Sequence, residues 1–163
     1  MNKKQRNIMR LLAQVGFYVY MILIFYFVLF SERYGRLSHT TYQYNLVLFK
    51  EIKRFIVYAH YFSFEELATN LFGNIFAFSP FGFLLPFMRD RKTGFFTVLF
   101  GTFCFSLSIE SMQLIFKLGV FDVDDLLMNT IGGIIGYLAY KIVRRVYHGK
   151  KRSLSYHRKN RVK

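Results

Sequence analysis

The side chains best suited to chemistry lie between residues 106 and 136, where carboxylates and amides interrupt a sequence that is otherwise apolar. One acid and one amide stand inside an apolar run, three aspartates follow within four positions, and an asparagine stands in the next apolar run. They are Glu110, Gln113, Asp122, Asp124, Asp125 and Asn129. An ionisable group inside a membrane-length apolar segment is costly to bury, so such a residue marks a candidate functional site.

The composition favours a membrane protein over a nucleic-acid-binding one. The chain has 163 residues, of which 53% are hydrophobic and 20% aromatic, and it carries a net charge of +14. The positive charge lies between and beyond long apolar runs, an arrangement typical of membrane proteins. Cys104 is the only cysteine, so no disulfide can form within the chain.

Four apolar segments of roughly 18–22 residues match the thickness of a bilayer, about 30 Å of hydrocarbon. They cover residues 11–30, 67–88, 95–116 and 126–143. The first is longer than the apolar core of a signal peptide and lacks a small-residue cleavage site, which indicates an uncleaved anchor. The pattern predicts an all-α membrane protein, an antiparallel bundle of four transmembrane helices within residues 1–146. Residues 147–163 are expected to form a basic, disordered cytoplasmic tail.

The distribution of lysine and arginine predicts the orientation of these four spans. Four basic residues precede the first span, three lie in the turn at 89–92, and ten lie between Lys141 and the end. These 17 share one side, against 6 on the other, so both termini are expected in the cytoplasm. The loop 31–66 and the turn 117–125 would then face outward.

The first outer loop has the periodicity of an amphipathic helix. Between residues 46 and 59, apolar side chains recur on one helical face and the charged side chains occupy the other. This segment is expected to lie on the outer leaflet. The alternative is an ordinary surface helix.

The predicted topology brings polar groups from all four spans to the same depth. Thr102, Ser106, Glu110 and Gln113 fall within about 80° of one another on a helix, near the outer end of the third span. Asn70 with Asn74, and Asp125 with Asn129, open the second and fourth spans. Arg33 follows the first span. We therefore expect a pocket at the outer leaflet that could hold the head group of a polar lipid, with arginine as the phosphate ligand.

Simpler explanations exist for each of these residues. Any single amide or acid could form a structural hydrogen bond between helices. Asp124 or Asp125 could cap the N-terminus of the fourth span and complement its dipole. A calcium loop is not indicated, because the position that should hold a bidentate glutamate is Gly133. We expect no metal and no cofactor.

Three ordered blocks of this sequence resemble the VanZ-like family. The blocks are Asn70–Pro86 with its two asparagines and two prolines, Ser106–Gln113, and Phe121–Gly132 with its acidic run. The resemblance implies a small multispan protein of the bacterial envelope, in a family named for an accessory protein of low-level resistance to teicoplanin. The positions that match the family's motifs are Arg33, Asn70, Asn74, Glu110, Gln113, Asp122, Asp124, Asp125 and Asn129.

Together these observations favour a non-enzymatic membrane protein that binds or alters outer-leaflet envelope lipids or their precursors. The expected partners are membrane lipids, such as polyprenyl-linked or anionic envelope lipids, and not nucleic acid. The alternative is an intramembrane hydrolase or transferase acting on a polyprenyl lipid or phospholipid. There Glu110 would serve as general acid or base and the aspartates would hold a divalent metal.

Overall fold

The computed structural model describes residues 3–30, 41–61, 63–88 and 93–160. Within this part of the chain the prediction of a helical protein is confirmed, and two three-residue strands are added to it. In chain order the elements are α1 (Lys3–Phe30), β1 (Gln43–Asn45), α2 (Lys50–Val57), the 3-10 helix η2 (Ala59–Tyr61), α3 (Phe64–Met88), α4 (Phe95–Ile115), β2 (Val120–Asp122) and α5 (Val123–Asn160).

Each of the four predicted apolar segments lies in one of the long helices. Over the described residues, three helices are long and apolar enough to cross a membrane, at Asn7–Phe27, Phe95–Ile115 and Val123–Tyr147. The fourth, α3, contains a shorter apolar stretch, Phe72–Met88. Several apolar helices of this kind are characteristic of a multi-pass membrane protein.

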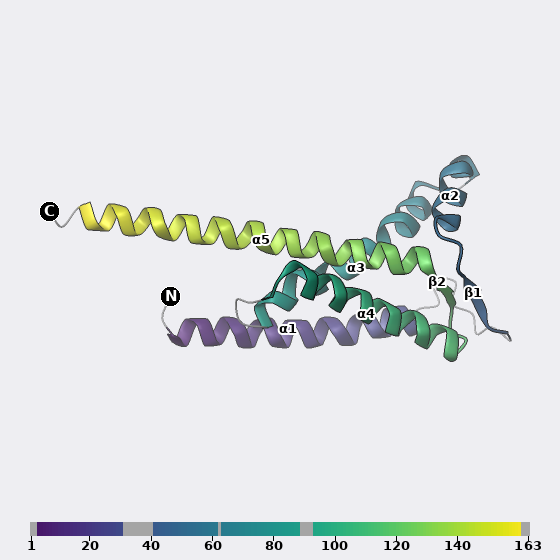
Figure 1. Cartoon of the computed structure of the whole chain (residues 1–163), viewed down its shortest axis with the longest axis horizontal. Coiled ribbons are helices and arrows are strands. Elements are labelled where there is room, and N and C mark those ends of the chain that lie inside the picture. Colours follow the sequence, from purple (N-terminus) through teal and green to yellow (C-terminus); the bar gives the residue numbers. More distant parts are fainter. Residues whose placement is uncertain (1–2, 31–40, 62, 89–92, 161–163) are drawn as a thin grey trace.

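Successive long helices run in opposite directions (Figure 1). The beginning of α1 and the end of α5 therefore lie at the same end of the molecule, and β1, β2 and α2 lie at the opposite end (Figure 1). The helix α5 extends from Val123 to Asn160. No proline interrupts the sequence between Val123 and Asn160, so nothing in this segment forces the helix to end earlier.

Glycines allow α3 and α5 to approach each other closely. A Cβ atom added to Gly82 of α3 would lie 1.8 Å from the carbonyl oxygen of Gly133. One added to Gly136 would lie 1.8 Å from the carbonyl oxygen of Ser79. Both distances are far below van der Waals contact, so the two backbones can meet only where side chains are absent.

Two prolines lie inside α3, and side-chain hydroxyls compensate for the hydrogen bonds disturbed there. Pro80 has no N–H to donate to the carbonyl oxygen of Phe76. The Ser79 hydroxyl donates to that oxygen at 3.1 Å. One residue further on, the Tyr20 hydroxyl of α1 donates to the carbonyl oxygen of Ala77 at 2.8 Å. The turn of α3 around Pro80 is thereby hydrogen-bonded to α1.

The segment after α1 forms a strand and a short helix that pack beside the start of α5. Strands β1 and β2 pair in parallel, with Asn45 opposite Asp122. The helix α2 is shorter than the predicted range 46–59, because Phe49 adopts a left-handed conformation (φ 64°) immediately before Lys50. Phe55 of α2 is buried, whereas Ile56, expected on the same face, is 63% exposed.

Candidate functional site

Polar side chains from β1, β2, α3, α4 and α5 meet at the end of the molecule opposite the beginning of α1 (Figure 1). We refer to them as the polar cluster. Its members with described side chains are Asn45, Asn74, Ser106, Glu110, Asp122, Asp124, Asp125 and Asn129. The structure thus brings together six of the nine site residues predicted from the sequence. It adds Asn45, and Ser106 joins them from the polar stripe expected on the third span.

Asp122 joins β1 to the beginning of α5. Its carboxylate accepts hydrogen bonds from the Asn45 amide at 3.1 and 3.3 Å. It also accepts the backbone N–H of Asp124 at 2.8 Å. Since α5 begins at Val123, this last contact is that of an N-cap residue. Asp122, and not Asp124 or Asp125, therefore caps the helix.

Asp124 caps a different helix, α2, which lies more than 60 residues earlier in the chain. Its carboxylate accepts the backbone N–H groups of Phe49, of Glu51 at 2.9 Å and of Ile52 at 3.4 Å. The first amides of a helix have no partner within the helix and carry partial positive charge. The side chain of Asp124 is only 2% exposed, and these three donors stabilise its buried charge.

Glu110 lies on α4 and connects that helix to β2. Its Oε2 atom accepts the backbone N–H of Asp122 at 3.2 Å, and the residue is 3% exposed. Gln113, one turn further along α4, is equally buried. Its side chain lies against Gly119, where an added Cβ would come within 3.4 Å of the Gln113 amide. The two residues pack under the turn that leads into β2.

Asp125 and Asn129 connect α5 to the two neighbouring long helices. The Asn74 amide of α3 donates to the Asp125 carboxylate at 2.6 Å. One turn deeper, the Asn129 amide donates to the Ser106 hydroxyl oxygen of α4 at 2.9 Å. Among the described residues, no group donates to the Asn129 Oδ1 atom, although this side chain is buried. Through the pair of Asn129 and Ser106 the cluster extends along α4 and α5, away from β2.

Two predicted site residues fall outside what the structure describes. Arg33 lies in the undescribed range 31–40. Asn70 is a helical residue of α3, but its side chain is outside the described set. Within the described residues, no three side chains of histidine, cysteine, aspartate or glutamate are arranged to share a metal ion.

The carboxylates of the polar cluster accept hydrogen bonds from side-chain and backbone amides of the same chain. Asp122 and Asp124 accept six hydrogen bonds from amide groups of this chain. Sequence reasoning missed Asn45 as a site residue, because it lies in the segment that follows α1, far in the sequence from the aspartate that it contacts. It also missed that backbone N–H groups at the start of α2 donate to Asp124, because every residue except proline has such a group and the sequence does not show which of them bind a side chain.

The comparisons with known proteins agree with the resemblance described above. The family model VanZ/LLP1 matches residues 17–144, which include every described member of the polar cluster. The chain is 28% identical over 136 residues to Protein VanZ of Enterococcus faecium, a match that covers 82% of this chain and 76% of that protein. No solved structure is significantly similar to the chain. With its apolar helices and a family match over most of its length, this chain is a membrane protein that belongs to the VanZ/LLP1 family.

Proposed function

We propose that the polar cluster binds or alters outer-leaflet envelope lipids or their precursors and thereby contributes to low-level resistance to teicoplanin-type glycopeptides. In this proposal α1, α3, α4 and α5 cross the membrane as an antiparallel bundle with both termini in the cytoplasm. The helix α2 lies on the outer surface of the membrane, and the polar cluster lies just below that surface.

The observation that carries the proposal is the convergence of buried acids and amides at one end of a set of apolar helices. Glu110 is 3% exposed and Asp124 is 2% exposed, in a chain whose helices are otherwise predominantly apolar. Burying such groups is costly unless they are paired, and a cluster retained at this cost is a functional-site hypothesis. The family match and the excess of basic residues at the opposite end support the envelope setting and the orientation.

We assign the acids different roles, according to the contacts that each of them makes. Asp124 accepts three backbone N–H groups from the start of α2, so we assign it to holding the outer segment in place. We assign Glu110 and Asp125 to the lipid head group, together with Gln113 and Asn129. Arg33 and Asn70 complete the proposed site as head-group ligands.

A structural function is the second candidate, and the hydrogen bonds themselves favour it. Asn74 with Asp125 joins α3 to α5, and Asn129 with Ser106 joins α5 to α4. Such pairs could hold the helices together without binding any lipid. In that case substitutions would reduce the amount of folded protein and would have no separate effect on resistance.

Teicoplanin tolerance in cells separates these two functions. Glu110→Gln and Asp125→Asn each remove a charge but keep an oxygen that can accept the bond from Asp122 or Asn74. At equal abundance in the membrane, we expect both variants to lose the tolerance conferred by the unchanged chain. Glu51→Gln is the matched control, since Glu51 pairs with Arg54 on the exposed side of α2. Unchanged tolerance in both test variants would refute the proposed function.

A further inference from the structure

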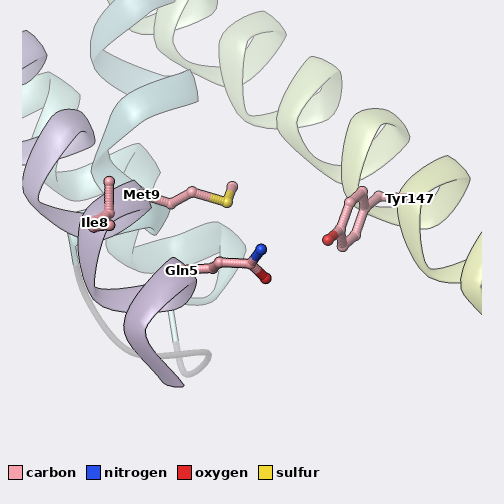
Figure 2. A pocket seen from close by; sticks show the side chains of 4 residues that line it. All are labelled: Gln5, Ile8, Met9 and Tyr147. Carbon is pink, nitrogen blue, oxygen red and sulfur yellow. The ribbon is translucent and has the colours of Figure 1, made fainter. Parts of the chain in front are cut away.

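A hollow lies between α1 and α5, at the end of the molecule opposite the polar cluster (Figure 1). It has a volume of about 460 Å³ and is lined by Gln5, Ile8, Met9 and Tyr147. Figure 2 shows the first three side chains on α1, with Tyr147 across from them on α5. The hollow is open to the surroundings of the protein, and most of its lining is apolar.

The helix segments on either side of this hollow are positively charged. Residues 3–10 of α1 contain four basic residues, and residues 141–147 of α5 contain three. Neither segment contains an aspartate or a glutamate. An apolar hollow flanked by basic helix segments, near the end of their apolar stretches, suits an anionic lipid.

The geometry of α5 singles out one of its two adjacent arginines. At 100° per residue, Arg144 lies about 60° from Tyr147 around the helix, whereas Arg145 lies about 160° away. Tyr140 lies about 20° from Tyr147 on the same side. The Arg144 guanidinium donates to the Tyr140 hydroxyl oxygen at 3.4 Å, so it lies on the same side of α5 as Tyr140. Arg144 is exposed, and it stands one turn before the end of the apolar stretch Val123–Tyr147.

We propose that this hollow binds an anionic phospholipid, with an acyl chain against Ile8, Met9 and Tyr147 and the phosphate at Arg144. Arginine matches the geometry of a phosphate oxygen pair better than lysine does, and its level at the end of the apolar stretch is that of a head group. The site shares no residue with the polar cluster. It requires only that α1 and α5 lie in a membrane.

Native mass spectrometry of the purified full chain tests this site, with palmitoyl-oleoyl phosphatidylglycerol and the phosphatidylcholine of identical chains as probes. We expect the chain to retain one phosphatidylglycerol in preference to phosphatidylcholine. Arg144→Gln should weaken this retention about tenfold, the effect of losing one charged hydrogen bond. Arg145→Gln, which removes the same charge from the other side of α5, should change retention less than twofold. Met9→Trp should also weaken it, because the larger side chain fills the hollow.

Two results would overturn the inference. One is equal retention of the two lipids, and the other is equal weakening by Arg144→Gln and Arg145→Gln, which would show only general attraction to charge. The test is independent of the proposed function. Glu110→Gln and Asp125→Asn should leave retention of phosphatidylglycerol unchanged, and Arg144→Gln should leave teicoplanin tolerance unchanged.

Discussion

The carboxylate of Asp124, in the first turn of α5, accepts the backbone N–H of Glu51 at the start of α2. The two residues are 73 positions apart in the sequence. Together with the neighbouring bonds from Phe49 and Ile52, this contact fixes the position of α2 relative to the polar cluster. An acid expected to bind a ligand thus holds a surface helix in place.

Replacing Asp124 with asparagine should release α2. A neutral amide oxygen is a weaker acceptor than a carboxylate, so the change should cost about 1.5–3 kcal/mol of stability in this region. Hydrogen–deuterium exchange should show faster exchange at the amides of residues 51 and 52, while α4 is unaffected. Glu51→Gln serves as the control, because it alters the surface of α2 but leaves its backbone donors paired. Unchanged exchange in Asp124→Asn would show that this carboxylate does not hold the helix.

The close contact between α3 and α5 predicts a sharp difference among glycines. Gly82→Ala and Gly136→Ala each place a Cβ within 1.8 Å of a backbone oxygen, so both should lower stability by about 1–3 kcal/mol or more. Gly16→Ala in α1 meets nothing within 4 Å and should be neutral or stabilise the helix by about 0.5–1 kcal/mol. Thermal unfolding in detergent measures both effects. Equal unfolding temperatures for Gly16→Ala and Gly136→Ala would contradict the packing described.

The Tyr20 hydroxyl should stabilise the turn of α3 around Pro80. Tyr20→Phe removes its bond to the Ala77 carbonyl oxygen and should cost about 0.5–1.5 kcal/mol. Tyr18→Phe is the matched control, since Tyr18 is 61% exposed. Thermal unfolding should distinguish the two variants, and a Tyr18→Phe effect as large as that of Tyr20→Phe would argue against this role.

The proposed orientation predicts which end of the bundle can be reached from outside the cell. In a Cys104→Ser background, a membrane-impermeant maleimide should label Phe116→Cys in intact cells. It should label Tyr147→Cys only after the membrane is opened. Phe116 is 60% exposed and Tyr147 is 51% exposed, so side-chain access alone would not separate them. The reverse pattern would place the polar cluster on the cytoplasmic side.

The long helices could be predicted from the sequence because each depends on a continuous run of apolar residues, which can be recognised without knowing any contact between distant residues. Runs of apolar residues long enough to span a membrane predicted the positions of α1, α3, α4 and α5. Glu110 was singled out as a candidate site residue because acids are rare inside such runs. The topology predicted that Asn74 and Asp125 would lie at the same depth, but it did not predict that they would pair.

The distribution of tasks among the three aspartates could not be predicted, because it depends on contacts that are remote in sequence. Strand β2 pairs with β1 and keeps residues 120–122 extended, so α5 begins at Val123 and Asp122 becomes its cap. The left-handed conformation of Phe49 is rare for a residue with a side chain, and no glycine or asparagine at this position indicated it.

The lipids that remain bound to the chain after extraction from bacterial membranes test the central claim most directly. Native mass spectrometry should detect, in addition to phosphatidylglycerol, a second envelope lipid on the unchanged chain and on Glu51→Gln. The same lipid should be absent from a chain that carries both Glu110→Gln and Asp125→Asn, although this chain remains folded. If the doubly substituted chain is folded and retains the same lipids in the same amounts, the polar cluster is not a lipid site.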